Sequence, residues 1–326
     1  MRTLNDAVTQ TRLCDFIREG ELAMTMQDDV INRLEALGYR AGMVPVARLA
    51  DLQNSIDRWR IDGIIGSDFF SGNLSGFVYS PPGDLPAAKS IVIVAIPDDP
   101  VHLWFDRQGA RTMVTVPPHY LHCMRKDRSA GEALSSILGP SGFRASRARL
   151  PVKLLAVSCG LARYGRNNIT YVDGMGSYYR LAAFFTDLEC SSHVWTEPAA
   201  MESCASCRAC TEACPSGAID PGRFLVRAER CITLWNEMPG GVPFPEWLDS
   251  SWHNCLVGCM RCQAICPANE GNDRVVDGAV FSEEETEMLL GGTPRGDLPQ
   301  PLMEKLEEWD LLESLDMLPR NLTPLL

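Results

Sequence analysis

The stretch SCASCRACTEACPSGAID, residues 203–220, carries four cysteines within eleven residues and dictates how the second half of the chain must fold. Their spacing is C-x2-C-x2-C-x3-C-P, the arrangement by which bacterial two-cluster ferredoxins bind [4Fe–4S] clusters. In that arrangement three cysteines wrap around one cluster, and the fourth, before a proline, ligates the other cluster. The stretch therefore predicts most of one cluster site and one ligand of a second.

A second run, GCMRCQAICP at 258–267, has the spacing C-x2-C-x3-C-P and lacks one cysteine of a full set. Crossed ligation then assigns the first cluster to Cys204, Cys207, Cys210 and Cys266. The second cluster receives Cys214, Cys259 and Cys262, and its fourth ligand is either Cys231 or Cys255. Zinc sites built from CxxC knuckles are the alternative, which two runs closed by Cys-Pro disfavour.

The composition fits a globular chain with metal ligands rather than disulfides. Its 326 residues are enough for one large or two ordinary domains. No apolar run reaches the length of a membrane span, and the first thirty residues lack the apolar core of a signal peptide, so we expect a cytoplasmic protein without membrane contact. Thirteen cysteines are an odd number without an export signal, which argues against a disulfide framework. Five cysteines outside the predicted clusters are expected to pack as small apolar residues: Cys14, Cys123, Cys159, Cys190 and Cys255.

Charge is unevenly distributed along the chain, whose net charge is −12. Residues 107–180 hold twelve Arg and Lys against three Asp and Glu, and residues 281–326 hold eleven Asp and Glu against three Arg and Lys. Two interpretations follow: the two regions are solvated faces that attract each other, or the basic region faces an anionic cofactor or partner.

The first 200 residues predict a mixed α+β fold. Residues 28–42 have helical spacing that ends at Gly38, and SIVIVAIP at 90–97 has the apolar run of a buried strand. Residues 152–160 fit a strand or a buried helical turn, and residues 176–188 fit either a helix or a strand. The glycine-rich region 159–188 contains neither a Walker A loop nor a dinucleotide-binding fingerprint.

Taken in order, CGLARYGRNNITYV, GMGSYYRLAAFFTDLE, the two cysteine runs and RCIT resemble the epoxyqueuosine reductases and, more distantly, the reductive dehalogenases. The resemblance runs from about Leu150 to Asn269. It implies an N-terminal nitroreductase-like α/β domain that binds cobalamin (1–195), a ferredoxin-like two-[4Fe–4S] domain (196–275) and an acidic C-terminal tail with one amphipathic helix at 303–318 (276–326).

The resemblance also implies individual roles. Cys231 matches the family's isolated cysteine, which makes it rather than Cys255 the fourth ligand of the second cluster. The residues matching the family's loop beside the corrin, and so predicted to bind the cofactor, are Gly160, Leu161, Gly165, Arg166, Asn167, Gly176 and Ser177.

Two departures from the family bear on the substrate. The family's proton-donating aspartate has no counterpart, because the comparable stretch FRASRARLPVKLLAV, 143–157, contains no acid. The tail is short and acidic, and acidic surfaces repel nucleic-acid phosphates. From these features we predict that the chain is not a true epoxyqueuosine reductase and that tRNA is a disfavoured, though not excluded, partner. In place of the missing aspartate, we predict that the proton donor is Tyr164, Lys153 or His119. Tyr120 and His122 are further candidates.

The predicted function is an iron–sulfur oxidoreductase that passes electrons through two [4Fe–4S] clusters to bound cobalamin, for reductive chemistry on a small molecule or a modified base. A low-potential donor such as ferredoxin or flavodoxin would supply the electrons. The alternative is a redox activator that reduces the corrinoid of a partner protein and has no substrate of its own. A plain electron carrier is a third hypothesis, which the size of the N-terminal region disfavours.

Overall fold

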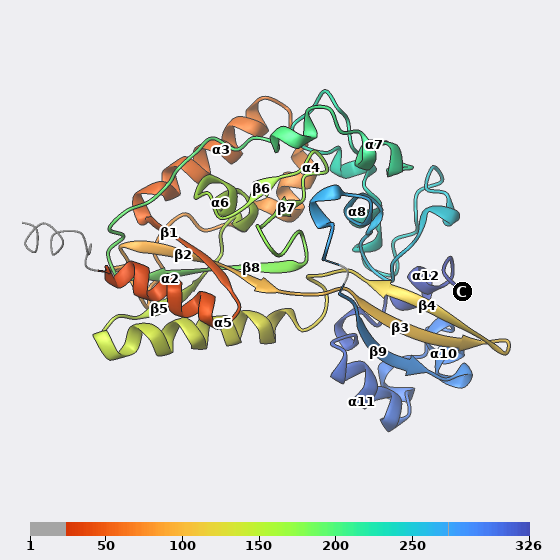
Figure 1. The fold of residues 1–326 in the computed structure, drawn as a ribbon. Helices are drawn as coiled ribbons and strands as arrows, with labels where there is room; N and C mark the ends of the chain where they lie inside the picture. The colour runs from red at the N-terminus through yellow and green to blue at the C-terminus, as the bar shows by residue number, and fades with distance from the viewer. Residues whose placement is uncertain (1–23, 273) are drawn as a thin grey trace, which may run out of the picture.

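The computed structural model describes residues 24–272 and 274–326 (Figure 1). Cys14, which we predicted to pack as a small apolar residue, lies outside these ranges. Within them, no helix is long and apolar enough to cross a membrane.

The larger sheet has four antiparallel strands in the order β1-β2-β8-β5. Its strands are β1 (Arg40–Pro45), β2 (Ser90–Pro97), β5 (Ala145–Ala148) and β8 (Tyr179–Thr186). Along β2, Ile91 and Ile93 belong to one apolar core, and Val92 and Val94 to another. The continuous apolar run therefore reflects a strand buried on both faces, as predicted from the sequence.

Helices cover both faces of this sheet (Figure 1). Side chains of α2 (Met26–Ala36) and α5 (Cys123–Leu138) pack on the Val92 face, and side chains of α3 (Leu49–Ile61) and α6 (Val152–Ser158) pack on the Ile91 face. The structure resolves the two ambiguous segments, because 152–158 is a helix and 179–186 is a strand. The helix predicted within 28–42 is confirmed, and Gly38 follows it with φ +87°.

A second, three-stranded sheet joins residues that are far apart in sequence. The β-hairpin of β3 (Val101–Arg107) and β4 (Ala110–Val116) adds β9 (Val276–Phe281) in parallel to β3. Its own core includes Phe105 and Phe281, whose rings stack 4.7 Å apart. The helices packed around it are α10 (Glu283–Leu290), α11 (Gln300–Glu308) and α12 (Leu318–Leu322).

The prediction of one amphipathic helix over 303–318 is wrong. The helix α11 ends at Glu308, and Asp310 has a left-handed backbone with φ +57°. The apolar residues beyond this turn do not continue the stripe of α11 but pack into the core of the three-stranded sheet. The basic region 107–180 and the acidic region 281–326 are in contact, because Arg107 forms an ion pair with Glu287 at 3.0 Å.

A loop-rich segment that holds the cysteine runs connects β8 to β9. Its short helices are α7 (Ala209–Ala213), α8 (Ile232–Asn236) and α9 (Arg261–Ala264). The hairpin of β6 (Arg163–Tyr164) and β7 (Thr170–Tyr171) precedes it, and α4 (Ser67–Phe69) continues into a π-helical turn, η2 (Phe70–Leu74).

The α+β class is confirmed, whereas the nitroreductase-like relationship and the three domain boundaries stay predictions. The pairing of β3 with β9 ties the first predicted domain to the last.

Candidate functional site

Four cysteines line one small enclosed cavity between the two cysteine runs. Cys204, Cys207 and Cys210 come from the first run and Cys266 from the second. Burial raises the pKa of the Cys210 thiol, and the charges of the Cys266, Cys204 and Cys207 thiols raise it further. Arg166 also lines this cavity, and its Nε is buried without a hydrogen-bond partner in the described structure. An anionic cluster with sulfur acceptors fits this orphaned donor.

The other four predicted ligands also lie together. Cys214, Cys231, Cys259 and Cys262 all line a larger cavity, which we name the cluster-side cavity. Burial raises the pKa of Cys231 and Cys262, and that of Cys259 to about 11. Thiolates are costly in such an environment unless a cation neutralises them, as a metal site does. Within 24–272 and 274–326, no three Cys, His, Asp or Glu side chains gather closely enough to hold one metal ion.

Cys255 lies near Cys259, and burial followed by the charge of Cys259 raises the pKa of the Cys255 thiol, but Cys255 does not line the same cavity. It is fully buried, and its residue forms a β-bridge with Thr115 of β4. It is not among the residues that line the two cysteine cavities. This geometry favours Cys231 over Cys255 as the fourth ligand of the second cluster.

A distal cavity adjoins the cluster-side cavity. The volumes are about 580 Å³ for the distal cavity and about 470 Å³ for the cluster-side cavity. Most of the distal wall is apolar and comes from the end of α3, the segment 64–77, the start of α6 and residues 225–229. The two cavities share five lining residues: Phe69, Lys153, Asn168, Val226 and Ala228.

The three predicted catalytic residues divide between these cavities. His119 lines the cluster-side cavity, Tyr164 lines the distal cavity, and Lys153 lines both. Burial, followed by the positive charge of Lys153, lowers the pKa of His119 to about 3, so His119 is a neutral imidazole at neutral pH. Burial raises the pKa of Tyr164 above its ordinary value, and Lys153 is exposed.

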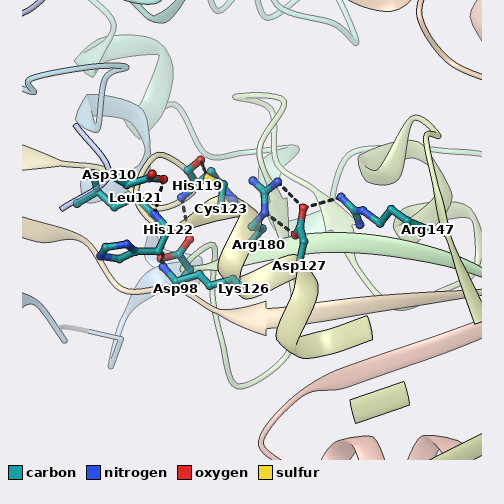
Figure 2. Close-up of polar contacts among 10 residues, drawn as sticks. All are labelled: Asp98, His119, Leu121, His122, Cys123, Lys126, Asp127, Arg147, Arg180 and Asp310. Atoms are coloured by element: carbon teal, nitrogen blue, oxygen red, sulfur yellow. Dashed lines mark hydrogen bonds and ion pairs between the residues drawn. The ribbon is translucent and has the colours of Figure 1, made fainter. Parts of the chain in front are cut away.

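The loop that carries His119 is held in an unusual backbone conformation (Figure 2). His119 and His122 both have positive φ angles, 82° and 59°. The His119 amide donates to Asp98 Oδ2 at 2.9 Å, and the His122 amide donates to Asp310 Oδ2 at 3.1 Å. Lys126 of α5 forms an ion pair with the same Asp98. His122 itself does not line either cavity.

One acidic residue of the site was missed by sequence reasoning. Glu237, just after α8, lines the cluster-side cavity and accepts a hydrogen bond from the Tyr120 hydroxyl. Glu237 is exposed, and partial desolvation of its carboxyl raises the pKa of that group. The only signal in the sequence is its place six residues after Cys231, which gives no reason to look for an acid there.

The predicted cofactor-binding loop lies mainly against the cysteine segment. Gly165 and Arg166 line the small cysteine cavity, and Asn167 lines both that cavity and the cluster-side cavity. The Ser177 amide donates to Asn269 Oδ1 at 2.7 Å, and Gly176 has no room for a Cβ beside Asn269. The members of the predicted set that are absent from the walls of both large cavities are Gly160, Leu161, Gly165, Arg166, Gly176 and Ser177.

The cysteine geometry defines an iron–sulfur protein, and the match to a family agrees. Residues 203–269 match the 4Fe-4S double cluster binding domain. The prediction of two [4Fe–4S] clusters is thereby confirmed at the level of the domain.

Beyond the matched domain, this chain is similar to proteins named epoxyqueuosine reductase. An epoxyqueuosine reductase of Francisella cf. novicida is 27% identical over 57% of this chain and 54% of its own length. That of Pseudomonas aeruginosa is 28% identical over 72% of this chain and 66% of its own length. The chain thus spans between half and two thirds of these relatives.

The fold is shared with solved epoxyqueuosine reductases. The Streptococcus thermophilus structure superposes with a TM-score of 0.65, at 19% identity over 90% of this chain and 78% of that chain. A structure with an epoxyqueuosine-modified tRNA-Tyr stem loop has a TM-score of 0.60, at 22% identity over 91% of this chain and 79% of that chain.

These findings overturn the prediction that the chain is not a true epoxyqueuosine reductase. Relatives from several bacteria and the solved structures of the same fold carry that name. The argument from residues 143–157 failed because an acid can reach the cavity from elsewhere in the chain, as Glu237 does.

Proposed function

We propose that this chain is a cobalamin-dependent iron–sulfur reductase of the epoxyqueuosine reductase type. The observation that carries the proposal is the direct contact between a large, mostly apolar cavity system and the Cys231 set of thiols. Large apolar cavities with a few polar groups are the usual form of cofactor sites. A redox activator of another protein's corrinoid would need an exposed docking face and no such cavity.

The first set of cysteines is proposed to hold the cluster that meets the electron donor. Cys204 and Cys207 are partly accessible, and the residues beside them, Ser206 and Arg208, are exposed. A low-potential donor such as ferredoxin or flavodoxin is proposed to dock there. The second set, Cys214, Cys231, Cys259 and Cys262, borders the cavity on the inner side.

The mostly apolar cavity residues, with a few polar groups among them, suit a corrin in polarity. When bound, cobalamin reduced to Co(I) supplies a strong nucleophile and electron source. Phe69, Val226 and Ala228 offer apolar contact where the two cavities meet, and Asn168 offers an amide. His119, neutral at the cluster-side wall, can accept or donate a hydrogen bond.

The substrate proposed is a small molecule or a modified base, and a tRNA-borne base is the first to test. The carboxyl of Glu237 and the phenol of Tyr120 are the acidic groups nearest the Cys231 wall, and a reduction that consumes electrons also consumes protons.

Anaerobic reconstitution with iron, sulfide and hydroxocobalamin tests this function. After desalting, we expect about eight irons and about one cobalt per chain, and turnover of epoxyqueuosine-containing tRNA by the reduced protein. Full iron without retained cobalt would contradict the proposal and favour the activator hypothesis.

A further inference from the structure

Arg166 lies in the turn between β6 and β7 and has one donor left over at the small cysteine cavity. Its Nη2 donates to the carbonyl oxygen of Cys204, and its Nη1 donates to that of Pro221 at 3.3 Å. The remaining donor, Nε, is buried and has no hydrogen-bond partner in the described structure. Within residues 24–272 and 274–326, no acidic side chain forms an ion pair with Arg166, so its positive charge has no counter-ion.

The wall of the small cysteine cavity indicates what accepts from Nε. Buried donors are nearly always paired in folded proteins, because an unmet donor loses its bond to water without replacement. Besides Arg166, the wall holds the four predicted ligands of the first cluster: Cys204, Cys207, Cys210 and Cys266. Arg166 lines neither of the two large cavities, so a ligand bound there would not reach Nε. The sulfur atoms of the first cluster would offer both acceptors and negative charge.

The turn that carries Arg166 is tightly closed. The Gly165 amide donates to the carbonyl oxygen of Ile169 at 2.8 Å, and Asn168 has a left-handed backbone with φ +59°. A Cβ at Gly165 would stand 2.7 Å from the ring of Tyr171, so this position has no room for a side chain. These contacts fix the place at which Arg166 leaves the backbone beside the cysteines.

Tyr171 supplies a second polar group from the same hairpin. The residue is only 3% exposed, and its hydroxyl accepts a hydrogen bond from Asn167 Nδ2 at 2.8 Å. Burial, followed by the neighbouring Cys266 thiol, raises the pKa of the Tyr171 phenol, so this phenol keeps its proton. Because Asn167 is the donor in the bond between the two side chains, the hydroxyl hydrogen of Tyr171 is free to donate to the Cys266 sulfur.

We propose that Arg166 and Tyr171 raise the reduction potential of the first cluster by donating hydrogen bonds to its sulfur atoms and, for Arg166, by its positive charge. A reduced cluster carries one more negative charge than the oxidised cluster, so a nearby cation and hydrogen-bond donors stabilise the reduced form. Arg166, predicted from the sequence to bind a corrin, thus serves the cluster. The inference rests on the first cysteine set of the proposed function and does not depend on a corrinoid or a substrate.

Anaerobic redox titration of the reconstituted full chain, followed by EPR, tests this role. Cys207→Ser removes the first cluster and thereby identifies its signal. We expect Arg166→Met to lower the first cluster's midpoint potential by about 59 mV, which is roughly a tenfold change in the equilibrium constant for one-electron reduction. Tyr171→Phe should lower the same midpoint by less, and the second cluster's midpoint should stay unchanged. The matched control is Arg163→Gln, in the same hairpin, whose side chain is 61% exposed and paired with Asp173.

A further variant separates charge from hydrogen bonding. Arg166→Lys keeps the positive charge but lacks the Nε donor, so its first-cluster midpoint should lie between those of the unaltered protein and Arg166→Met. If Arg166→Met fails to retain about eight irons, Arg166→Lys and Tyr171→Phe decide the question, because absence of a shift in both would overturn the proposal.

Three other results would also overturn the proposal. The first is an unchanged first-cluster midpoint in Arg166→Met, which with loss of bound cobalamin would place Arg166 at the corrin instead. The second is an equal shift of both midpoints, which would indicate general entry of solvent. The third is a shift of the same size in Arg163→Gln. If the unaltered protein retains no corrinoid, the proposed cobalamin function fails, while the midpoints still decide the role of Arg166.

Discussion

The hydroxyl of Tyr120 donates a hydrogen bond to the carboxylate of Glu237, joining residues 117 positions apart at the wall of the cluster-side cavity. Tyr120 comes from the loop after β4, and Glu237 follows the short helix α8. Arg320 of α12 fixes the segment after α8 by donating to the carbonyl oxygens of Met238 and Val242, both at 2.7 Å. The acidic group of the site is thus held by three separate parts of the chain.

Replacing Glu237 by Gln keeps an acceptor for Tyr120 but removes the titrating carboxyl. Because partial desolvation raises the pKa of Glu237 above 4.5, the folded state holds this proton more tightly than the unfolded state. The stabilisation is present at low pH and is lost as pH rises through the raised pKa. As pH rises from 4.5 through the raised pKa, we therefore expect the free energy of unfolding of the unaltered protein to fall relative to that of Glu237→Gln.

Anaerobic urea unfolding at several pH values measures this difference. The exposed Glu212 supplies the control Glu212→Gln. A pH-independent difference between Glu237→Gln and the unaltered protein would show that the carboxyl has an ordinary pKa. Proton delivery to substrate predicts in addition that Glu237→Gln keeps both clusters and loses turnover.

His119 gives a pH dependence of the opposite sign. Its pKa is lowered to about 3 in the folded protein, so the unfolded chain takes up a proton first as pH falls below 6.5. Stability is complete above pH 6.5 and declines as pH falls, by as much as about 1.4 kcal/mol at one unit below. Asn tolerates the left-handed backbone of this position, so His119→Asn should fold and show a flatter profile. Parallel profiles for the two proteins would contradict the burial of a neutral imidazole.

The ligand assignment predicts different iron losses for different cysteines. Cys207→Ser should lose about half of the iron, because one of two four-iron clusters loses a ligand, whereas Cys255→Ser should keep all of it. Cys255 is the matched control because it is fully buried and lies outside both cysteine cavities. Iron analysis and EPR after anaerobic purification decide between these outcomes. If Cys255→Ser loses iron and Cys231→Ser does not, the fourth ligand is Cys255.

Gly258 leaves room for Tyr120. A Cβ at this position would stand 2.6 Å from the Tyr120 hydroxyl, and the residue has φ +68°. Gly258→Ala is therefore expected to displace Tyr120 from Glu237 in addition to straining the backbone by roughly 1–2 kcal/mol. Gly109→Ala is the control, because Gly109 has φ +75° and open space around it. Equal losses of stability in urea unfolding would mean that Tyr120 can move at no cost.

Asp127 of α5 ties the larger sheet to its helix through two arginines (Figure 2). It accepts hydrogen bonds from Arg180 Nε at 2.7 Å and from Arg147 Nη2 at 2.6 Å. Only 7% of the Asp127 side chain and 21% of the Arg180 side chain are exposed, so Asp127→Asn should cost about 1–3 kcal/mol by weakening the charged hydrogen bonds to Arg180. Asp106→Asn, which breaks the solvated pair with Arg111, should have a much smaller effect. Comparable midpoints in denaturant would contradict the burial of the Asp127 network.

Local chemistry made the cluster domain predictable from sequence. The spacing of cysteines and prolines in 203–214 and 259–267 restricts how thiolates wrap around a cluster, and the family match agrees with it. The strand at 90–97 was predictable for a similar reason, since eight residues with an apolar run can only be buried as a strand in this context. These features depend on residues close together in sequence.

The tertiary structure alone decided which distant residues share the cavity. Glu237 reaches it from α8, Lys153 from α6 and His119 from a loop with a left-handed backbone, and no local pattern relates their positions. The same holds for β3 and β9, whose pairing joins residues 101–107 to residues 276–281 and folds the acidic C-terminal segment into a core. The cluster domain and the main strand could be predicted from sequence because both depend on residues close together in the chain. The charge, acidity and shape of the cavity could not be predicted from sequence, because they arise from packing between segments that are far apart in the chain.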